Sequence, residues 1–245
     1  MSNRKRFFLL LAGLVVGLAT TFILPQPRGW VYSMFRKVFR YSVDDRLRQY
    51  KEPVRRRVEP DLRAAGLDWP PERIVLLGLK QEKRLELYAA GADQPLRYVK
   101  SWPVLAASGQ AGPKLRSGDR QVPEGLYRIE SLNPNSRFHL SARIDYPNAA
   151  DRARAGAEGR SDLGGDIMIH GSDASVGCLA MGDPAAEEIF VLLALTGLEK
   201  VQVVLAPHDF RVDPADPPLP AGAPAWANQR YEQIREAMAQ LPLGP

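Results

Sequence analysis

Between residues 138 and 146 the side chains alternate strictly between apolar and polar, and this pattern limits the possible folds more than any other in the chain. The apolar positions are Phe138, Leu140, Ala142, Ile144 and Tyr146, and the polar ones are His139, Ser141, Arg143 and Asp145. A period of two is the spacing of a β-strand with one buried face. The 21 prolines among 245 residues also argue against an all-helical protein, because proline disrupts helix interiors.

Six further segments have the composition and the flanking turn residues of strands. They are residues 73–80, 84–90, 96–108, 124–130, 166–171 and 200–207. Residues 184–197 predict a helix with Asp183 as its cap and Gly197 at its end. Residues 147–165 are expected to form an exposed loop, and about 225–241 a C-terminal helix. The predicted fold class is mostly β (α+β): a sandwich-like sheet domain with one packed helix.

The N-terminus has the pattern of an export signal. MSNRKR carries three positive charges and precedes an uncharged, mostly apolar run at residues 7–24. Its eighteen residues exceed the usual 7–15 of a signal-peptide core and reach the roughly 17–25 needed to span a bilayer. No small-x-small cleavage site follows. We therefore expect a single-pass inner-membrane anchor with the remaining chain in the periplasm; a cleaved signal would release that chain into the periplasm.

Basic residues are concentrated next to this expected anchor. Residues 28–73 carry twelve Lys and Arg against seven Asp and Glu, in a chain of net charge +5. Helical spacing is expected over 29–66, broken at Pro53 and Pro60. The charge suits anionic lipid headgroups or a wall polymer, and a solvated linker explains it equally well. Nucleic acid is excluded as a partner, because the chain is expected to be exported and carries no recognition motif.

These signals divide the chain into four parts. The predicted boundaries are a signal anchor at 1–27, a basic helical linker at 28–72, a catalytic domain at 73–210, and a proline-rich segment with a C-terminal helix at 211–245.

The only cysteine, Cys178, lies in DIMIHGSDASVGCLAMGD, residues 166–183, eight residues after His170. A single cysteine excludes an internal disulfide and any multi-cysteine metal site. Gly177 allows a sharp turn before the following helix. A turn at a helix N-terminus offers backbone N–H groups to an oxyanion and lowers a thiol pKa. His170 could serve as the base, with the carbonyl of Gly171 accepting from its other ring nitrogen. The alternative is a buried, inert thiol beside a hydrogen-bonded histidine.

The stretch HGSDASVGCLAMGD resembles the active-site signature of the L,D-transpeptidase catalytic domain family, the YkuD-like proteins. GPKLRSGDRQVPEGLYRI resembles a second segment of that family. NPNSRFHLSARIDYPNAAD is similar to a segment of its YafK-like branch. The resemblance covers residues of about 73–207 and implies an L,D-transpeptidase-like β-sandwich.

The resemblance implies roles for individual residues of this motif. Cys178 matches the nucleophile, which would be acylated by a peptidoglycan stem peptide to give a thioester. His170 matches the base, and the carbonyl of Gly171 matches the group that orients it. Ser175 and Gly177 match the serine and glycine of Ser-x-Gly-Cys, and the N–H groups of Gly177 and Cys178 would be oxyanion donors. No cofactor or metal is required.

The motif departs from the common family pattern in three ways. Val176 replaces a second histidine, Ala180 replaces an arginine, and the spacing from His170 to Cys178 is shorter. All three agree with the YafK-like branch, and they put substrate choice in doubt more than chemistry.

Two alternatives to a cross-linking transpeptidase therefore stay open. One is a hydrolase of the same fold, which would cleave stem-peptide bonds or release a wall-attached lipoprotein. The other is a non-catalytic wall-binding module.

Three further residues are candidates for substrate binding. His139 lies on the polar face of its strand, where a surface or structural role is the stronger interpretation. Lys114 and Arg116 lie in the loop rich in glycine and proline, and could meet a carboxylate of the stem peptide. A solvated loop is an equally good interpretation of that segment.

Overall fold

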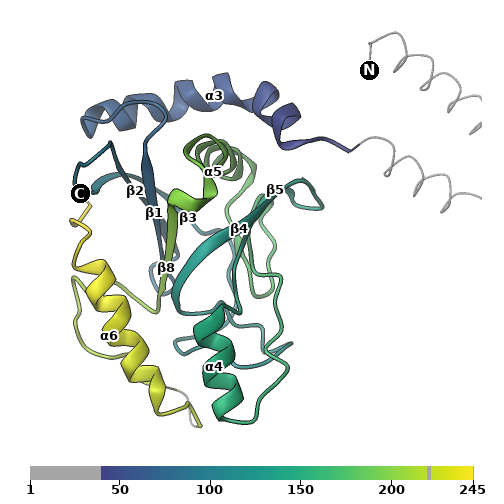
Figure 1. Cartoon of the computed structure of the whole chain (residues 1–245), viewed down its shortest axis with the longest axis vertical. Coiled ribbons are helices and arrows are strands. Elements are labelled where there is room, and N and C mark those ends of the chain that lie inside the picture. The colour runs from purple at the N-terminus through teal and green to yellow at the C-terminus, as the bar shows by residue number, and fades with distance from the viewer. Residues whose placement is uncertain (1–39, 220–221, 245) are drawn as a thin grey trace, which may run out of the picture. The chain divides into compact units, whose positions relative to one another are not determined.

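The computed structural model describes residues 40–219 and 222–244. The expected anchor at 1–27 lies outside these residues. Among the described residues, no helix combines the length and the apolar composition that a membrane crossing requires. Ser42–Pro245 forms one compact unit, a mixed α+β fold that the described residues build from one curled sheet and four α-helices (Figure 1). Three of these helices fall in segments that were predicted to be helical, but more than one packs against the sheet, so the prediction of a single packed helix was wrong.

Eight strands form the sheet in the order β3-β2-β1-β8-β4-β5-β6-β7. The pairs β1–β8 and β6–β7 are parallel and the others are antiparallel. The strands are β1 Arg73–Leu79, β2 Arg84–Ala90, β3 Arg97–Pro103, β4 Gly125–Ser136, β5 His139–Ile144, β6 Met168–His170, β7 Leu179–Ala180 and β8 Val201–Ala206. The predicted strand segments are confirmed to within a few residues at most ends.

Strand β4 makes this a single curled sheet in place of the separate sheets of a sandwich. Its first residues, from Gly125, pair with β8, and its later residues, to Ser136, pair with β5. The register with β5 shifts at two places along the strand. Such irregularities bend a strand and increase its twist, so the β5–β6–β7 part curls away from the β1–β2–β8 part.

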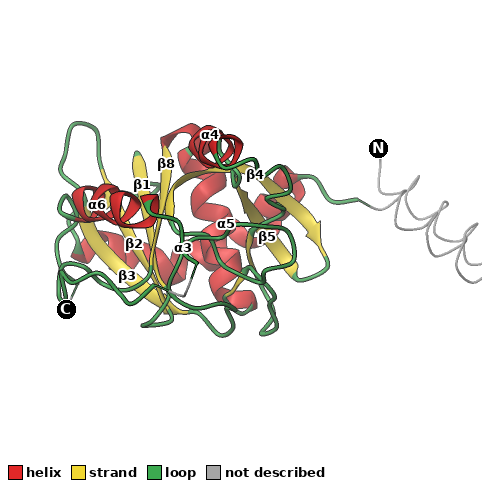
Figure 2. Ribbon diagram, turned by 90° about the horizontal axis from the view of Figure 1, so that it is seen from below, coloured by secondary structure: helices red, strands yellow, loops and turns green. Residues whose placement is uncertain are grey.

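The β1–β2–β8 part of the sheet is buried on both faces. Ile74 and Leu76 of β1 belong to the apolar cluster that includes residues of α3 (Val43–Ala64) and α5 (Asp183–Thr196). Val75 and Leu77 belong to the cluster formed with α6 (Trp226–Met238). Successive side chains point to opposite faces of a strand, so helices on both faces require continuous apolar runs (Figure 2). The predicted C-terminal helix is confirmed as α6.

Helix α3 runs without a break through Pro53 and Pro60, contrary to the expectation that these prolines would divide it. Ser42 caps its start in a capping box with Asp45. Its buried residues Val54, Val58 and Leu62 recur every four residues and face the core. Each internal proline costs about 3 kcal/mol, and burial of this apolar stripe offsets that cost.

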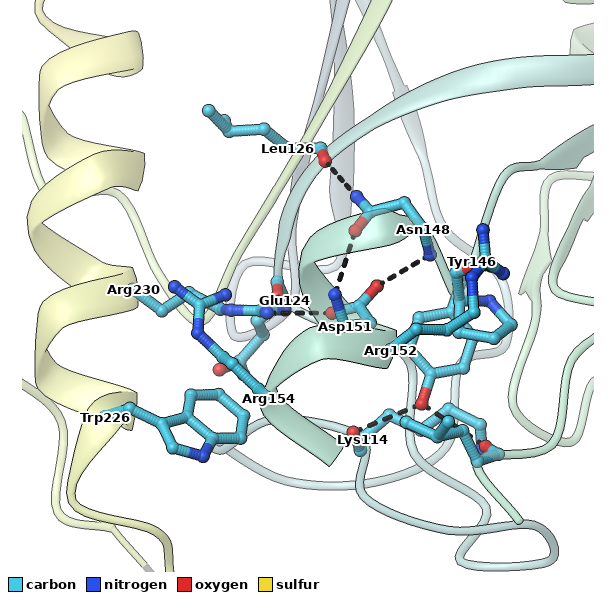
Figure 3. A network of polar contacts seen from close by, with 12 residues as sticks. Lys114, Glu124, Leu126, Tyr146, Asn148, Asp151, Arg152, Arg154, Trp226 and Arg230 are labelled. Atoms are coloured by element: carbon cyan, nitrogen blue, oxygen red, sulfur yellow. Dashed lines mark hydrogen bonds and ion pairs between the residues drawn. The ribbon is translucent and has the colours of Figure 1, made fainter. Parts of the chain in front are cut away.

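A fourth helix, α4 (Ala149–Ala157), occupies the segment that was expected to be an exposed loop. Asn148 caps it, and the Asp151 side chain accepts from the Asn148 backbone N–H. Asp151 is buried, and its Oδ1 accepts a hydrogen bond of 2.7 Å from the Arg230 guanidinium of α6 (Figure 3). The Asn-x-x-Asp spacing is a helix-start signal that the glycine and charge content of the segment obscured.

Candidate active site

The register of β6 and β7 brings the histidine and the cysteine to one place on the sheet. Ile169 pairs with Leu179 and His170 with Ala180 in parallel, so Cys178, just before β7, falls opposite Met168. The Met168 N–H donates to Cys178 Sγ at 3.3 Å. His170 ends β6 and Cys178 immediately precedes the paired strand β7, so the register places the two residues on adjoining segments, two positions apart along the ladder.

A hydrogen bond to the neighbouring carbonyl holds the His170 ring in one tautomer. His170 is buried, with 2% of its surface exposed, and its Nδ1 lies 2.6 Å from the Gly171 carbonyl oxygen. A carbonyl only accepts, so Nδ1 carries the hydrogen and the neutral ring presents Nε2 as the proton acceptor. Burial lowers the pKa of His170, and the bond to Gly171 opposes that effect. The imidazole is therefore neutral at pH 7.

Phe138 packs directly against that imidazole. The two rings stack with centroids 4.7 Å apart at an interplanar angle of 30°. The alternating pattern placed Phe138 on the buried face, but β5 begins at His139 and Phe138 lies in the preceding turn, 43% exposed. Sequence alternation could not identify this contact, because it depends on the turn between β4 and β5.

The Cys178 thiol is neutral at rest. Burial raises its pKa, and the hydrogen bond from Met168 acts in the opposite direction. Its Sγ also lies 3.5 Å from the Asp166 carbonyl oxygen. The expectation that the following helix would lower this pKa was wrong, because burial outweighs the polar contacts.

Asp183 fixes the loop between the histidine and the cysteine. Its Oδ1 accepts from the Ser172 N–H at 2.8 Å, whereas the predicted capping bond to α5 is absent and Gly182 is the N-cap residue. A Cβ at Gly171 would lie 2.5 Å from this same Oδ1 and 2.8 Å from the Phe138 carbonyl oxygen. Only glycine fits there, so the carbonyl that contacts His170 is held at a fixed position.

The two N–H groups predicted as oxyanion donors both bond to serine hydroxyls. The Cys178 N–H donates to Ser175 Oγ at 3.1 Å, and that hydroxyl donates to the Cys178 carbonyl at 2.7 Å. The Gly177 N–H donates to Ser108 Oγ at 2.7 Å, with Gly177 in the left-handed region at φ 79°. Sequence reasoning missed Ser108, because nothing local connects it to a residue 69 positions away.

Lys114 is already paired within the protein. Its ammonium is buried and contacts Asp119 Oδ1 at 2.5 Å and the Arg116 carbonyl oxygen at 2.9 Å. Its own carbonyl accepts from the Tyr146 hydroxyl (Figure 3). Lys114 therefore stabilises the loop, whereas the Arg116 side chain is exposed.

His139 contacts the two helices α3 and α5. Its Nε2 lies 3.1 Å from Oε1 of Glu187 in α5. Its ring packs edge-on against the ring of Tyr50 in α3, with the ring centroids 5.5 Å apart. Glu187 also pairs with Arg57 of α3 at 2.9 Å. These contacts join β5 to α3 and α5, which is a structural role. Within the described ranges, no group of three or more His, Cys, Asp or Glu residues forms a metal site.

Comparison with known proteins adds independent information on this arrangement. The family model described as the L,D-transpeptidase catalytic domain, YkuD, matches residues 72–204. YafK of Escherichia coli (strain K12) is 37% identical over 170 residues, which cover 67% of this chain and 62% of YafK. The chain thus spans less than two thirds of the length of that relative.

Two solved structures also align with the chain. The helical cell shape determining protein Pgp2 from Campylobacter jejuni gives a TM-score of 0.45 at 23% identity, covering 62% of this chain and 55% of Pgp2. Mycobacterium tuberculosis L,D-transpeptidase 1 gives 0.33 at 12% identity, covering 55% of this chain and 62% of that one.

Proposed function

The chain belongs to the L,D-transpeptidase catalytic domain family, YkuD, and on this basis we propose that it is a cysteine acyltransferase acting on peptidoglycan stem peptides. The observation that carries the proposal is the 2.6 Å contact between His170 Nδ1 and the Gly171 carbonyl oxygen. This contact leaves Nε2 as the basic nitrogen of a neutral imidazole, at the end of the strand that pairs with the segment following Cys178. A neutral base beside a neutral thiol suits general-base activation of the nucleophile.

The reaction would proceed in two acyl transfers. His170 Nε2 takes the thiol proton as Cys178 Sγ attacks the carbonyl carbon on the L-centre side of an L,D peptide bond. The carbonyl oxygen becomes an oxyanion, and the amine leaves with the proton from His170. The resulting thioester is attacked by the amine of a second stem, which His170 deprotonates, and Cys178 is released as a thiol.

Water in place of the second amine would make the same site a hydrolase. Val176 is 70% exposed, on the loop just before the nucleophile, where the common family pattern has histidine. An exposed valine neither covers the loop nor offers a hydrogen bond to an acceptor amine. This observation favours keeping hydrolysis, including release of a wall-attached lipoprotein, as the second candidate.

We further propose that the catalytic unit acts in the periplasm from a single-pass anchor in the inner membrane. The support lies in the sequence: three positive charges followed by the apolar run at 7–24, and then the basic residues of 28–73.

The first test is incubation of the full-length protein, in detergent, with purified peptidoglycan that retains its bound protein. Products are identified by mass spectrometry, with Cys178→Ala as the control. New stem-to-stem cross-links would establish a transpeptidase. Tripeptide ends or released protein without new cross-links would establish a hydrolase. Identical products from wild type and Cys178→Ala would refute both and leave the wall-binding module.

A further inference from the structure

The hydrogen-bond ladder beside the nucleophile stops one pair short of it. Residues 105–106 run along the free edge of β7, where Ala106 and Ala180 form an antiparallel bridge. The Ala180 N–H donates to the Ala106 carbonyl at 2.9 Å. Continuing that register by two residues places Ser108 opposite Cys178. A backbone pair at that position would bond Cys178 to Ser108 directly.

Side-chain hydroxyls take the place of this missing backbone pair. The Cys178 N–H donates to Ser175 Oγ, and the Ser108 carbonyl lies 3.4 Å from the Val122 N–H. The Gly177 N–H donates to Ser108 Oγ, whose own hydrogen goes to the Arg120 carbonyl at 2.6 Å. The Ser108 oxygen thus lies where an oxyanion would receive the Gly177 N–H.

We propose that Ser108 is a catalytic residue of the oxyanion site, an inference that rests on the proposed acyl transfer. When Cys178 Sγ bonds to the carbonyl carbon, the π electrons of the carbonyl move to its oxygen. That oxygen replaces Ser108 Oγ on the Gly177 N–H. Ser108 then turns its hydrogen from the Arg120 carbonyl to the oxyanion and keeps its proton throughout.

The energetics favour this exchange in the transition state over the ground state. A hydrogen bond to an ionised oxygen is about twice as strong as one between neutral groups. The hydroxyl gives up a neutral carbonyl acceptor and gains an anionic one, and no buried N–H is left without a partner. The Ser108 hydroxyl also supplies a side-chain donor next to the loop of Val176, whose own side chain carries none.

The test compares Ser108→Ala, Ser108→Thr and wild type as full-length proteins. The control is Ser117→Ala, which removes an exposed hydroxyl from the same loop. Release of stem-peptide products from purified peptidoglycan gives kcat and KM. Alkylation of Cys178 by iodoacetamide gives a second rate, which requires the thiolate but forms no oxyanion.

We expect Ser108→Ala to lower kcat about 100-fold with KM and the alkylation rate unchanged. Ser108→Thr should recover most of the activity, and Ser117→Ala should match wild type. A Ser108→Ala protein with wild-type kcat would overturn the assignment, as would parallel losses of kcat and alkylation, which indicate a displaced loop. If wild type and Cys178→Ala release the same products, the proposed function itself fails, and the role of Ser108 falls with it.

Discussion

The β1–β2–β8 part of the sheet and the β6–β7 edge are built in opposite ways. Strand β1 has seven residues, of which all pair with β2 and six pair with β8, and helices bury both of its faces. Strands β6 and β7 have three and two residues, and the backbone N–H groups around them bond to serine hydroxyls and to Asp183. The first part is stabilised by apolar burial. The second also buries Ile169 and Leu179 in the core, but side-chain oxygens complete its backbone hydrogen bonding.

The largest expected effect is a loss of activity without a loss of stability, from a substitution at the β6–β7 edge. His170→Ala should reduce acyl transfer by about 1000-fold, because removing a general base costs roughly 10²–10⁴. Alkylation of Cys178, measured at a pH high enough to ionise the thiol without a base, should stay close to wild type. Product formation and alkylation would be measured on the same preparation. A His170→Ala protein that turns over normally would exclude this histidine as the base.

A substitution in the core should lower the free energy of unfolding far more than one in the exposed loop. Leu77 of β1 is fully buried against α6, and Leu77→Ala should lower the free energy of unfolding by about 4 kcal/mol. Val176→Ala, at the exposed loop position, should change it by less than about 0.5 kcal/mol. Urea denaturation measures both values. Equal losses from the two variants would contradict the contrast between the regions.

Glu124 links Lys80, just after β1, to the loop at Gly112 and to α6, so its removal should lower the free energy of unfolding. Its buried carboxylate accepts from Lys80 at 2.8 Å, from the Gly112 N–H at 3.0 Å and from the Tyr231 hydroxyl at 3.0 Å. Glu124→Gln leaves the Lys80 ammonium without its counter-charge and should cost about 3 kcal/mol.

The double variant Lys80→Met with Glu124→Gln removes both charges and should recover part of that loss in urea denaturation. A double variant less stable than Glu124→Gln would show that the charge pair is not the cause.

The smallest effect concerns the pH dependence of the base. The lowered pKa of His170 keeps the ring neutral below its usual value of about 6.5, so activity should be lost only as the pH falls further. Phe138→Ala exposes the ring, so the pKa should rise and the acidic limb of kcat/KM should move to higher pH by less than one unit. A shift to lower pH would mean that Phe138 does not keep water from His170.

The helix and strand positions were largely predictable because they depend on local periodicity. The motif around Cys178 could be recognised by its resemblance to a family signature, since His170, Gly171 and Cys178 lie within nine residues. The continuity of α3 through two prolines was not, because the burial that offsets their cost comes from α5 and the sheet. The prediction that Asp183 caps α5 was wrong, because its carboxylate accepts from the Ser172 N–H of the preceding loop instead.

The sequence by itself determined the mixed strand and helix content and the helix that follows the cysteine. Tertiary structure alone decided that the thiol pKa rises, that Phe138 covers the imidazole, and that Ser108 reaches the Gly177 N–H. The physical reason is distance along the chain. Periodicity and capping act over a few residues, whereas burial and sheet register bring together groups tens of residues apart, and no local pattern encodes which of them will meet.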